Sequence, residues 1–239
     1  MRCALFGKLP SKRDFIALHA PRSFLSVWEP WMQSGISASR QHLGPAWQQA
    51  FLQAPIWRFW LGADLCGAAV LGAFMSSLDG VGRYYPLTVF AWSDEGAPIP
   101  PPEFDAQEEW FAAAEEFLLS TLAPETPYEH VTAALDQLGP PSTAEAASSL
   151  GADVPSDGVL AMAAGGRPFT ELFASLRVAD QGRAYAGSTY WWTIGGEGFE
   201  PLALSGRHMP EPLLFADMLT GRFGPGGDLT NPPLGLTDA

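Results

Sequence analysis

Lysine and cysteine are scarce in this chain of 239 residues, which contains two of each. Only 16% of its residues are charged, and acidic residues outnumber basic ones so far that the formal net charge is −13. Nucleic acids and anionic membranes need a broad basic surface, so this charge argues against both as main partners. Cys3 and Cys66 lie within apolar runs, which favours buried thiols in a reducing compartment over a disulfide or a metal pair.

Long hydrophobic segments are also absent. The run from 65 to 78 has 14 residues, fewer than the ~20 that cross a bilayer as a helix. We therefore expect no membrane insertion. Between Arg2 and Gly7 only four apolar or small residues occur, too few for a signal peptide, which predicts a cytoplasmic protein.

The motifs of common enzyme classes are missing too. Gly7-Lys-Leu-Pro10 has neither the second glycine before the lysine nor the Ser or Thr after it that a phosphate-binding loop needs. No Gly-x-Ser-x-Gly sequence occurs, and the four histidines are remote from one another in sequence, unlike metal ligands. Gly195-Gly-Glu-Gly198 is followed by Phe199-Glu-Pro201, which breaks a dinucleotide-binding pattern. We predict a protein that is not an enzyme and needs no cofactor.

Hydrophobic residues are abundant: they make up 47% of the chain, and nine of them are tryptophans. This content is enough for a substantial core. The order of helices and strands predicts an α/β fold, a layered α-β-α sandwich around a mixed sheet that both halves of the chain share. One domain of residues 1–223 is expected, followed by a Gly/Pro-rich, loosely held tail, 224–239. Helical patterns cover 22–43, 47–52, 104–123, 128–138, 169–176 and 212–222, and strand patterns cover 2–7, 56–61, 68–75, 84–92, 159–163 and 188–194.

Three of these segments carry more specific expectations. In Phe104–Ala123, aromatic and apolar residues share one helical face and four glutamates share the other, so we expect a core face and a solvated acidic face. We expect 159–163 to be a buried strand, and 139–158 to be a loop with a short helix at 143–150. Adjacent or odd-spaced tryptophans in strands, such as Trp57 and Trp60, predict a sheet covered on both faces.

The most informative stretch is Ser76–Thr88, which sets one acid, one arginine and two glycines between two apolar runs. Gly80 and Gly82 can adopt backbone angles that are closed to other residues. Asp79 and Arg83 are therefore presented at a corner between strands. They either only stabilise the turn or form a binding site, and their side chains either pair with each other or reach towards Lys8–Arg13.

Basic residues gather in a second segment near the N-terminus. Residues 1–100 carry a net charge of +2, whereas residues 101–239 carry −15, and both lysines, Lys8 and Lys12, lie beside Arg13. Such a patch fits an acidic or phosphorylated protein surface. The alternative is that these charges, with Asp14, merely solvate a loop.

Several motifs occur in a specific order along the chain: Phe6-Gly-Lys-Leu-Pro10, Asp14-Phe15, Trp28-Glu-Pro-Trp31 with Gln33 and Gly35, Pro55-Ile-Trp-Arg-Phe59, Cys66-Gly67 and the Asp79–Thr88 segment. In this order and spacing they resemble the TagF family, also called ImpM, of proteins associated with bacterial type VI secretion. The resemblance is strong over residues 3–92 and weaker near 188–192 and 210–215. Two positions depart from the family pattern: Arg13 replaces a glycine, and Ser76 replaces a proline.

The resemblance implies a post-translational repressor of type VI secretion that contacts a forkhead-associated-domain protein of that system. A structural accessory or scaffold subunit of the secretion apparatus is the alternative, and an enzyme with a site around Asp14, Asp79 and Arg83 is a third. The candidate partner-binding residues are Lys8, Pro10, Lys12, Asp14, Asp79, Gly82, Arg83 and Tyr84.

Overall fold

The computed structural model describes residues 1–93, 98–144, 151–156 and 159–223. The predicted tail, 224–239, and most of the short helix expected at 143–150 lie outside these residues. The strands are β1 (Cys3–Gly7), β2 (Ile16–Leu18), β3 (Trp57–Leu61), β4 (Val70–Met75), β5 (Leu87–Trp92), β6 (Asp153–Ser156), β7 (Val159–Ala161), β8 (Ser188–Thr193) and β9 (Leu202–Arg207). The helices are α1 (Arg22–Leu43), η1 (Gly44–Ala46), α2 (Trp47–Gln53), α3 (Ala63–Cys66), α4 (Glu108–Ser120), α5 (Tyr128–Gln137), α6 (Phe169–Ala179), α7 (Gln181–Ala184) and α8 (Leu214–Thr220).

Seven strands form one sheet in the order β2-β1-β5-β4-β3-β8-β9, and every neighbouring pair is antiparallel. The prediction of a mixed sheet is therefore wrong. Parallel neighbours need a long crossover connection, whereas β3, β4 and β5 follow one another with each strand running back beside the last. The first and last parts of the chain do share the sheet, because β3 pairs with β8.

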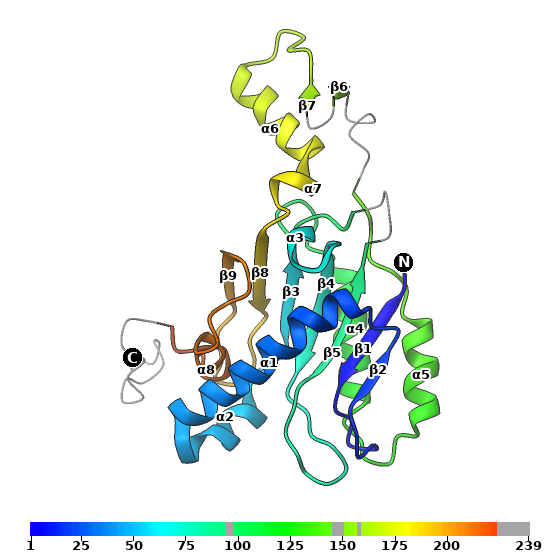
Figure 1. Ribbon diagram of the computed structural model, residues 1–239, viewed down its shortest axis with the longest axis vertical. Helices are drawn as coiled ribbons and strands as arrows, with labels where there is room; N and C mark the ends of the chain where they lie inside the picture. The colour runs from blue at the N-terminus through cyan, green and yellow to red at the C-terminus, as the bar shows by residue number, and fades with distance from the viewer. Residues whose placement is uncertain (94–97, 145–150, 157–158, 224–239) are drawn as a thin grey trace, which may run out of the picture.

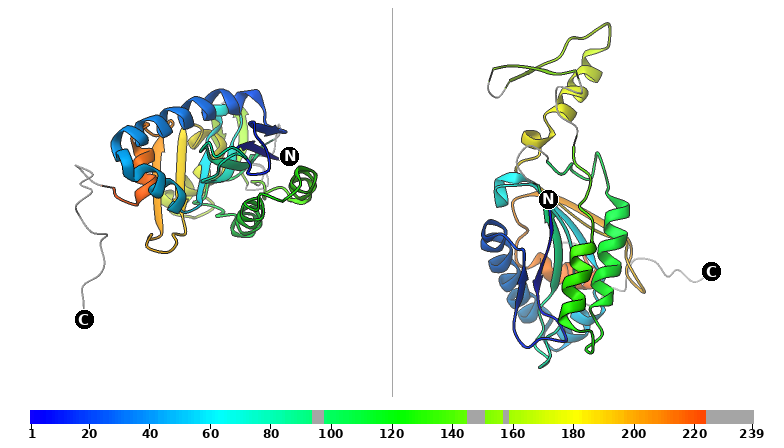
Figure 2. Two further views of the ribbon diagram at one scale, coloured as in Figure 1. Left: turned by 90° about the horizontal axis from the view of Figure 1, so that it is seen from below. Right: turned by 90° about the vertical axis from the view of Figure 1, so that its right-hand side faces the viewer.

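Helices cover both faces of this sheet, as the layered prediction required. α1, α2 and α8 lie on one face, and α4 and α5 lie on the other (Figures 1 and 2). Side chains alternate along β3, so that Trp57 belongs to the core under α1 and Trp60 to the core under α4. Trp191 and Trp192 divide between the two cores in the same way.

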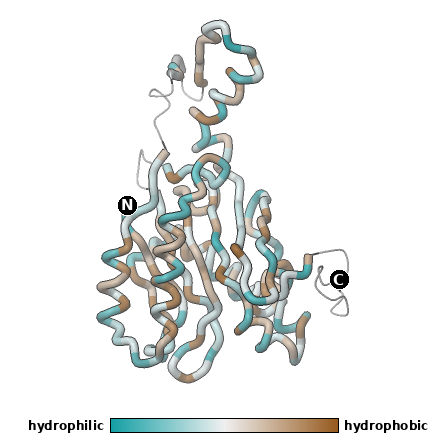
Figure 3. The backbone as a smooth tube through the Cα atoms, turned by 180° about the vertical axis from the view of Figure 1, so that it is seen from behind, coloured by the Kyte–Doolittle hydropathy of each residue, from teal (hydrophilic) through white to brown (hydrophobic). Residues whose placement is uncertain are grey.

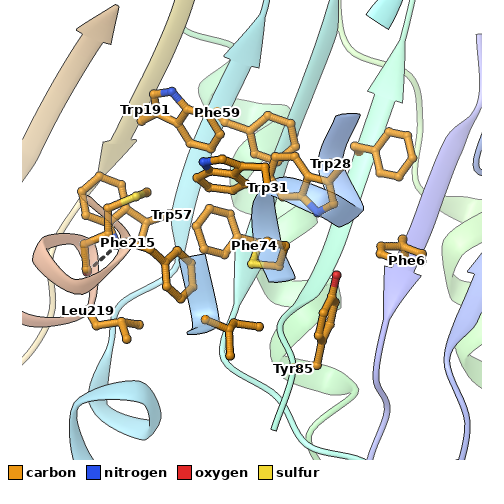
Figure 4. Packing of buried hydrophobic residues seen from close by; sticks show 14 of the residues in the cluster. Phe6, Trp28, Trp31, Trp57, Phe59, Phe74, Tyr85, Trp191, Phe215 and Leu219 are labelled. Atoms are coloured by element: carbon orange, nitrogen blue, oxygen red, sulfur yellow. Dashed lines mark hydrogen bonds between the residues drawn. The ribbon is translucent and has the colours of Figure 1, made fainter. Parts of the chain in front are cut away.

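The core under α1 is aromatic (Figure 4). Trp28 stacks on Trp191 with ring centroids 5.9 Å apart, and Trp31 donates a hydrogen bond from Nε1 to the Pro210 oxygen at 2.8 Å. Each fully buried large side chain contributes about 1.5–3 kcal/mol through removal of apolar surface from water. At Gly35 an added Cβ would lie 2.9 Å from the Phe215 Cβ, so glycine permits the close approach of α1 and α8.

The core under α4 contains a buried charge. α4 begins at Glu108 rather than at Phe104, and Trp110, Phe111 and Phe117 face the sheet as expected. The prediction that all four glutamates of this helix are solvated is wrong for Glu115, whose side chain is 14% exposed and pairs with Arg58 at 2.6 Å.

A smaller unit extends away from the sheet. It consists of the β6–β7 pair with α6 and α7 and forms the upper arm in Figure 1. The prediction of a buried strand at 159–163 is wrong, because among the described strands β7 pairs only with β6, and Val159 is 49% exposed. α6 carries hydrophobic as well as hydrophilic residues at this distance from the core (Figure 3), and Phe169 and Phe173 are both largely exposed. Within the described residues, no helix has the length and apolarity needed to cross a membrane.

Candidate partner-binding site

Two connections meet at one end of the sheet: residues 8–15, between β1 and β2, and residues 76–86, between β4 and β5. We call them the loop pair; they lie at the lower end of Figure 1. They meet because β1 and β5 are antiparallel neighbours, with Gly7 opposite Leu87. Gly7 has a φ of 134°, and a Cβ there would lie 2.1 Å from the Pro86 oxygen, so glycine is required at this junction.

Asp79 is the centre of the loop pair and is completely buried. Its Oδ2 accepts hydrogen bonds from Lys8 Nζ and from Arg83 Nε, both at 2.7 Å. Its Oδ1 accepts from the backbone N–H groups of Val81, at 3.1 Å, and Arg83, at 2.9 Å. Burial alone would raise the pKa of Asp79, but these hydrogen bonds outweigh it and hold the pKa well below its usual range.

Both alternatives for the Asp79 and Arg83 side chains are therefore realised. They pair with each other, and they also reach the N-terminal segment, where Arg83 Nη2 donates to the Arg13 oxygen. Asp79 and Lys8 are 71 positions apart in sequence, so this ion pair joins the two connections.

Further hydrogen bonds join the two loops and close the turn within one of them. Gly80 N–H donates to the Lys12 oxygen at 2.7 Å, and Ser77 Oγ donates to the Lys8 oxygen at 2.8 Å. Gly82 N–H donates to the Asp79 oxygen at 2.9 Å and closes a turn in which Gly82 has a φ of 82°. The two connections thus form one cross-linked unit, and side chains on its outer surface are held in fixed positions.

The outer surface of the loop pair combines arginine with apolar groups. The Arg83 side chain is 58% exposed, Val81 is 56% exposed and Phe15 is 47% exposed. Arg13 is exposed beside them. The Phe15 ring packs edge-on against Tyr85 at 4.7 Å and lies under the Lys8 ammonium at 5.0 Å, which fixes its position. Aromatic and arginine side chains are the residues that most often anchor protein interfaces.

The remaining predicted residues have different positions. Lys12 turns towards α5, where its ammonium lies 4.1 Å from the Tyr128 ring centroid. Pro10 is half-buried, and its carbonyl oxygen closely approaches Gly80. Asp14 is exposed, and among the described residues no hydrogen bond or ion pair joins it to Asp79 or Arg83.

Tyr84 attaches the loop pair to α2. Its ring packs edge-on against Trp47 and Phe51, at 5.6 and 5.7 Å, and its hydroxyl accepts a hydrogen bond from Gln48. Lys8, Asp79 and Tyr84 therefore position the surface, whereas Arg83 forms part of it.

Sequence reasoning included Arg13 in the basic patch but did not select Phe15 or Val81 as surface contacts. Phe15 and Val81 are apolar, and apolar residues are normally assigned to the core. Their signal was their place in polar connections outside the apolar periodicity of the strands.

Comparison with known proteins agrees with the resemblance seen in the sequence. The family described as TagF N-terminal domain, Type VI secretion system-associated, matches residues 4–138. The fold is similar to that of PA0076 from Pseudomonas aeruginosa PAO1, with a TM-score of 0.76 and 31% identity over 93% of this chain and 96% of the other. No match was found among curated proteins. The matched residues include both connections of the loop pair, and the chain belongs to the TagF family of type VI secretion-associated proteins.

Proposed function

We propose that this protein is a non-enzymatic regulator that represses type VI secretion after its components have been synthesised. It acts through contact with a forkhead-associated-domain protein of the secretion system, and the loop pair provides the contact surface. The family to which the chain belongs supports the link to type VI secretion. The contact surface is supported by the geometry of the loop pair.

The observation that carries the proposal is the fixed presentation of Arg83. Its guanidinium is held by Asp79 and by the Arg13 carbonyl, yet more than half of the side chain remains exposed. A side chain that is already ordered loses little conformational entropy on binding, which favours affinity. A partner that binds here gains a preorganised arginine next to the apolar Phe15 and Val81.

Charge indicates the kind of surface that the partner presents. The loop pair contains four basic residues and two acidic ones, a net +2 in a chain whose net charge is −13. The Lys8 and Asp79 charges neutralise each other inside. The charges that remain are those of two arginines and Lys12 against one exposed acid, Asp14. An acidic patch on the partner is electrostatically complementary to this net positive charge.

Gene deletion separates repression from a scaffold role. Loss of a repressor raises secretion by the type VI apparatus, whereas loss of a structural subunit abolishes it. We expect deletion to increase secretion and the wild-type gene to restore the low level. Abolished secretion in the deletion strain would contradict repression and support the scaffold alternative.

A further inference from the structure

The strand β9 forms an open edge of the sheet. It pairs with β8 on one side, and no described strand pairs with its other side (Figure 1). The exposure pattern agrees with an open edge. Leu202 and Leu204 face the core under α1 but are only half-buried. Ala203, Ser205 and Arg207 are exposed.

This edge lacks the features that normally prevent pairing with another strand. Edge strands are commonly guarded by charged residues, proline or a bulge. From Leu202 to Gly206 the sequence has no charge and no proline, and the register with β8 is regular over all six residues. β9 can therefore accept a further strand.

The backbone groups available for pairing follow from the ladder. His208 N–H donates to the Gly187 oxygen, on the β8 side, at 3.3 Å. Along an antiparallel ladder, the N–H and C=O groups of successive residues point alternately to the two sides of the strand. The N–H and C=O groups of Ala203, Ser205 and Arg207 therefore point away from β8. Small side chains at 203 and 205 allow a second backbone to approach closely.

The charges at the two ends of β9 indicate which strand pairs with its open edge. Glu197 and Glu200 are exposed before the strand, and Arg207 is exposed at its end. When two copies of β9 pair antiparallel about a twofold axis, the acidic end of one copy lies beside the basic end of the other. With Leu204 on the axis, Ala203 of each copy exchanges hydrogen bonds with Ser205 of the other, and Arg207 lies opposite Pro201, next to Glu200 of the other copy.

We propose that β9 is a homodimerisation edge, through which two copies of this chain join their sheets into one continuous antiparallel sheet. The interaction is isologous, so both edges are closed at once and no further copy can add. It leaves the loop pair free, because the loop pair lies on other strands of the sheet, β1, β2, β4 and β5.

Sedimentation equilibrium of the full chain, from low to high micromolar concentration, tests this proposal. We expect a monomer–dimer equilibrium for the wild type. Ser205→Pro removes an N–H that points away from β8, a position at which an edge strand tolerates proline, so the fold should persist while the dimer dissociation constant rises at least ~tenfold. Ser205→Ala is the matched control and should dimerise like the wild type.

A second pair of variants tests the charges without changing the backbone. Arg207→Glu should weaken the dimer, and addition of Glu200→Lys should restore it, because the swap recreates opposite charges across the axis. A wild type that stays monomeric overturns the proposal. A dimer that neither Ser205→Pro nor Arg207→Glu weakens also overturns it, because another surface then forms the dimer.

Discussion

Replacement of Asp79 by asparagine should destabilise the protein far more than any exposed charge substitution. The change keeps the size of the side chain and removes its charge. Lys8, whose side chain is 7% exposed, then has a buried ammonium without a counter-ion. Removal of one partner of a buried ion pair costs about 3–5 kcal/mol. The lost pairing with Arg83 adds little, because that side chain is 58% exposed and its charge is solvated.

The expected loss is a large fraction of the stability of a typical protein, about 5–15 kcal/mol. For a chain of this size, each 1 kcal/mol shifts the melting temperature by about 2–4 °C, which gives a decrease of roughly 6–20 °C for Asp79→Asn. Thermal unfolding followed by circular dichroism at pH 7 measures it. The double variant Lys8→Met with Asp79→Asn should recover part of the loss, because it leaves no buried ammonium without a counter-ion.

The effect should also depend on pH in one direction. The folded-state pKa of Asp79 is lowered from the ordinary 3.8, so the unfolded chain binds the proton more readily. The stabilisation is complete above the unfolded pKa and disappears as the pH falls through the folded pKa. The difference between wild type and Asp79→Asn should therefore shrink as the pH falls below about 4. A difference that is constant with pH, or a double variant less stable than Asp79→Asn, would refute the ion-pair reasoning.

Three further predictions concern the second core, the loop junction and catalysis. Glu115→Gln should lower the free energy of unfolding, measured in urea, by about 3 kcal/mol, because it leaves buried Arg58 with one weak partner. Glu108→Gln, at a side chain that is 67% exposed, should lower it by less than about 1 kcal/mol. Equal losses for the two variants would contradict this prediction. Gly7→Ala should lower the melting temperature, since its Cβ would overlap the Pro86 oxygen, while Gly139→Ala, where a Cβ meets nothing within 4 Å, should not. Calorimetry with ATP, GTP and divalent metals should give no saturable heat, and a stoichiometric micromolar isotherm would overturn the non-enzymatic proposal.

Much of the fold could be predicted from the sequence because burial imposes periodicity. The helix at Arg22–Leu43 was predicted with the bounds that the structure has, and the strands at 56–61, 68–75 and 84–92 were predicted within a few residues. Strand direction was not predictable, since the alternation of side chains is the same in parallel and antiparallel strands. β9 was missed because an edge strand with one half-buried face lacks a strong hydrophobic pattern.

The candidate site was predictable in its location but not in its internal contacts. The Asp79–Arg83 pairing and its reach to the N-terminal segment were both expected as alternatives, and the structure shows both. The structure adds that Asp79 is buried and accepts a hydrogen bond from Lys8. This contact was not predictable because it depends on the strand order, which brings distant segments together. The Arg58–Glu115 pair was missed for the same reason: two charges 57 positions apart meet only when α4 packs on the sheet.

The most direct test of the proposed function is the affinity of Arg83→Glu for the forkhead-associated-domain partner, measured by titration calorimetry beside Arg22→Glu. Arg22 is exposed at the start of α1, away from the loop pair, so its variant controls for the same change in net charge. We predict that Arg83→Glu weakens binding more than tenfold, a loss of about 1.4 kcal/mol or more, while Arg22→Glu binds like the wild type and both variants remain folded. Unchanged affinity for a folded Arg83→Glu, especially with a lowered melting temperature, would contradict the account and leave Arg83 with a structural role in the turn.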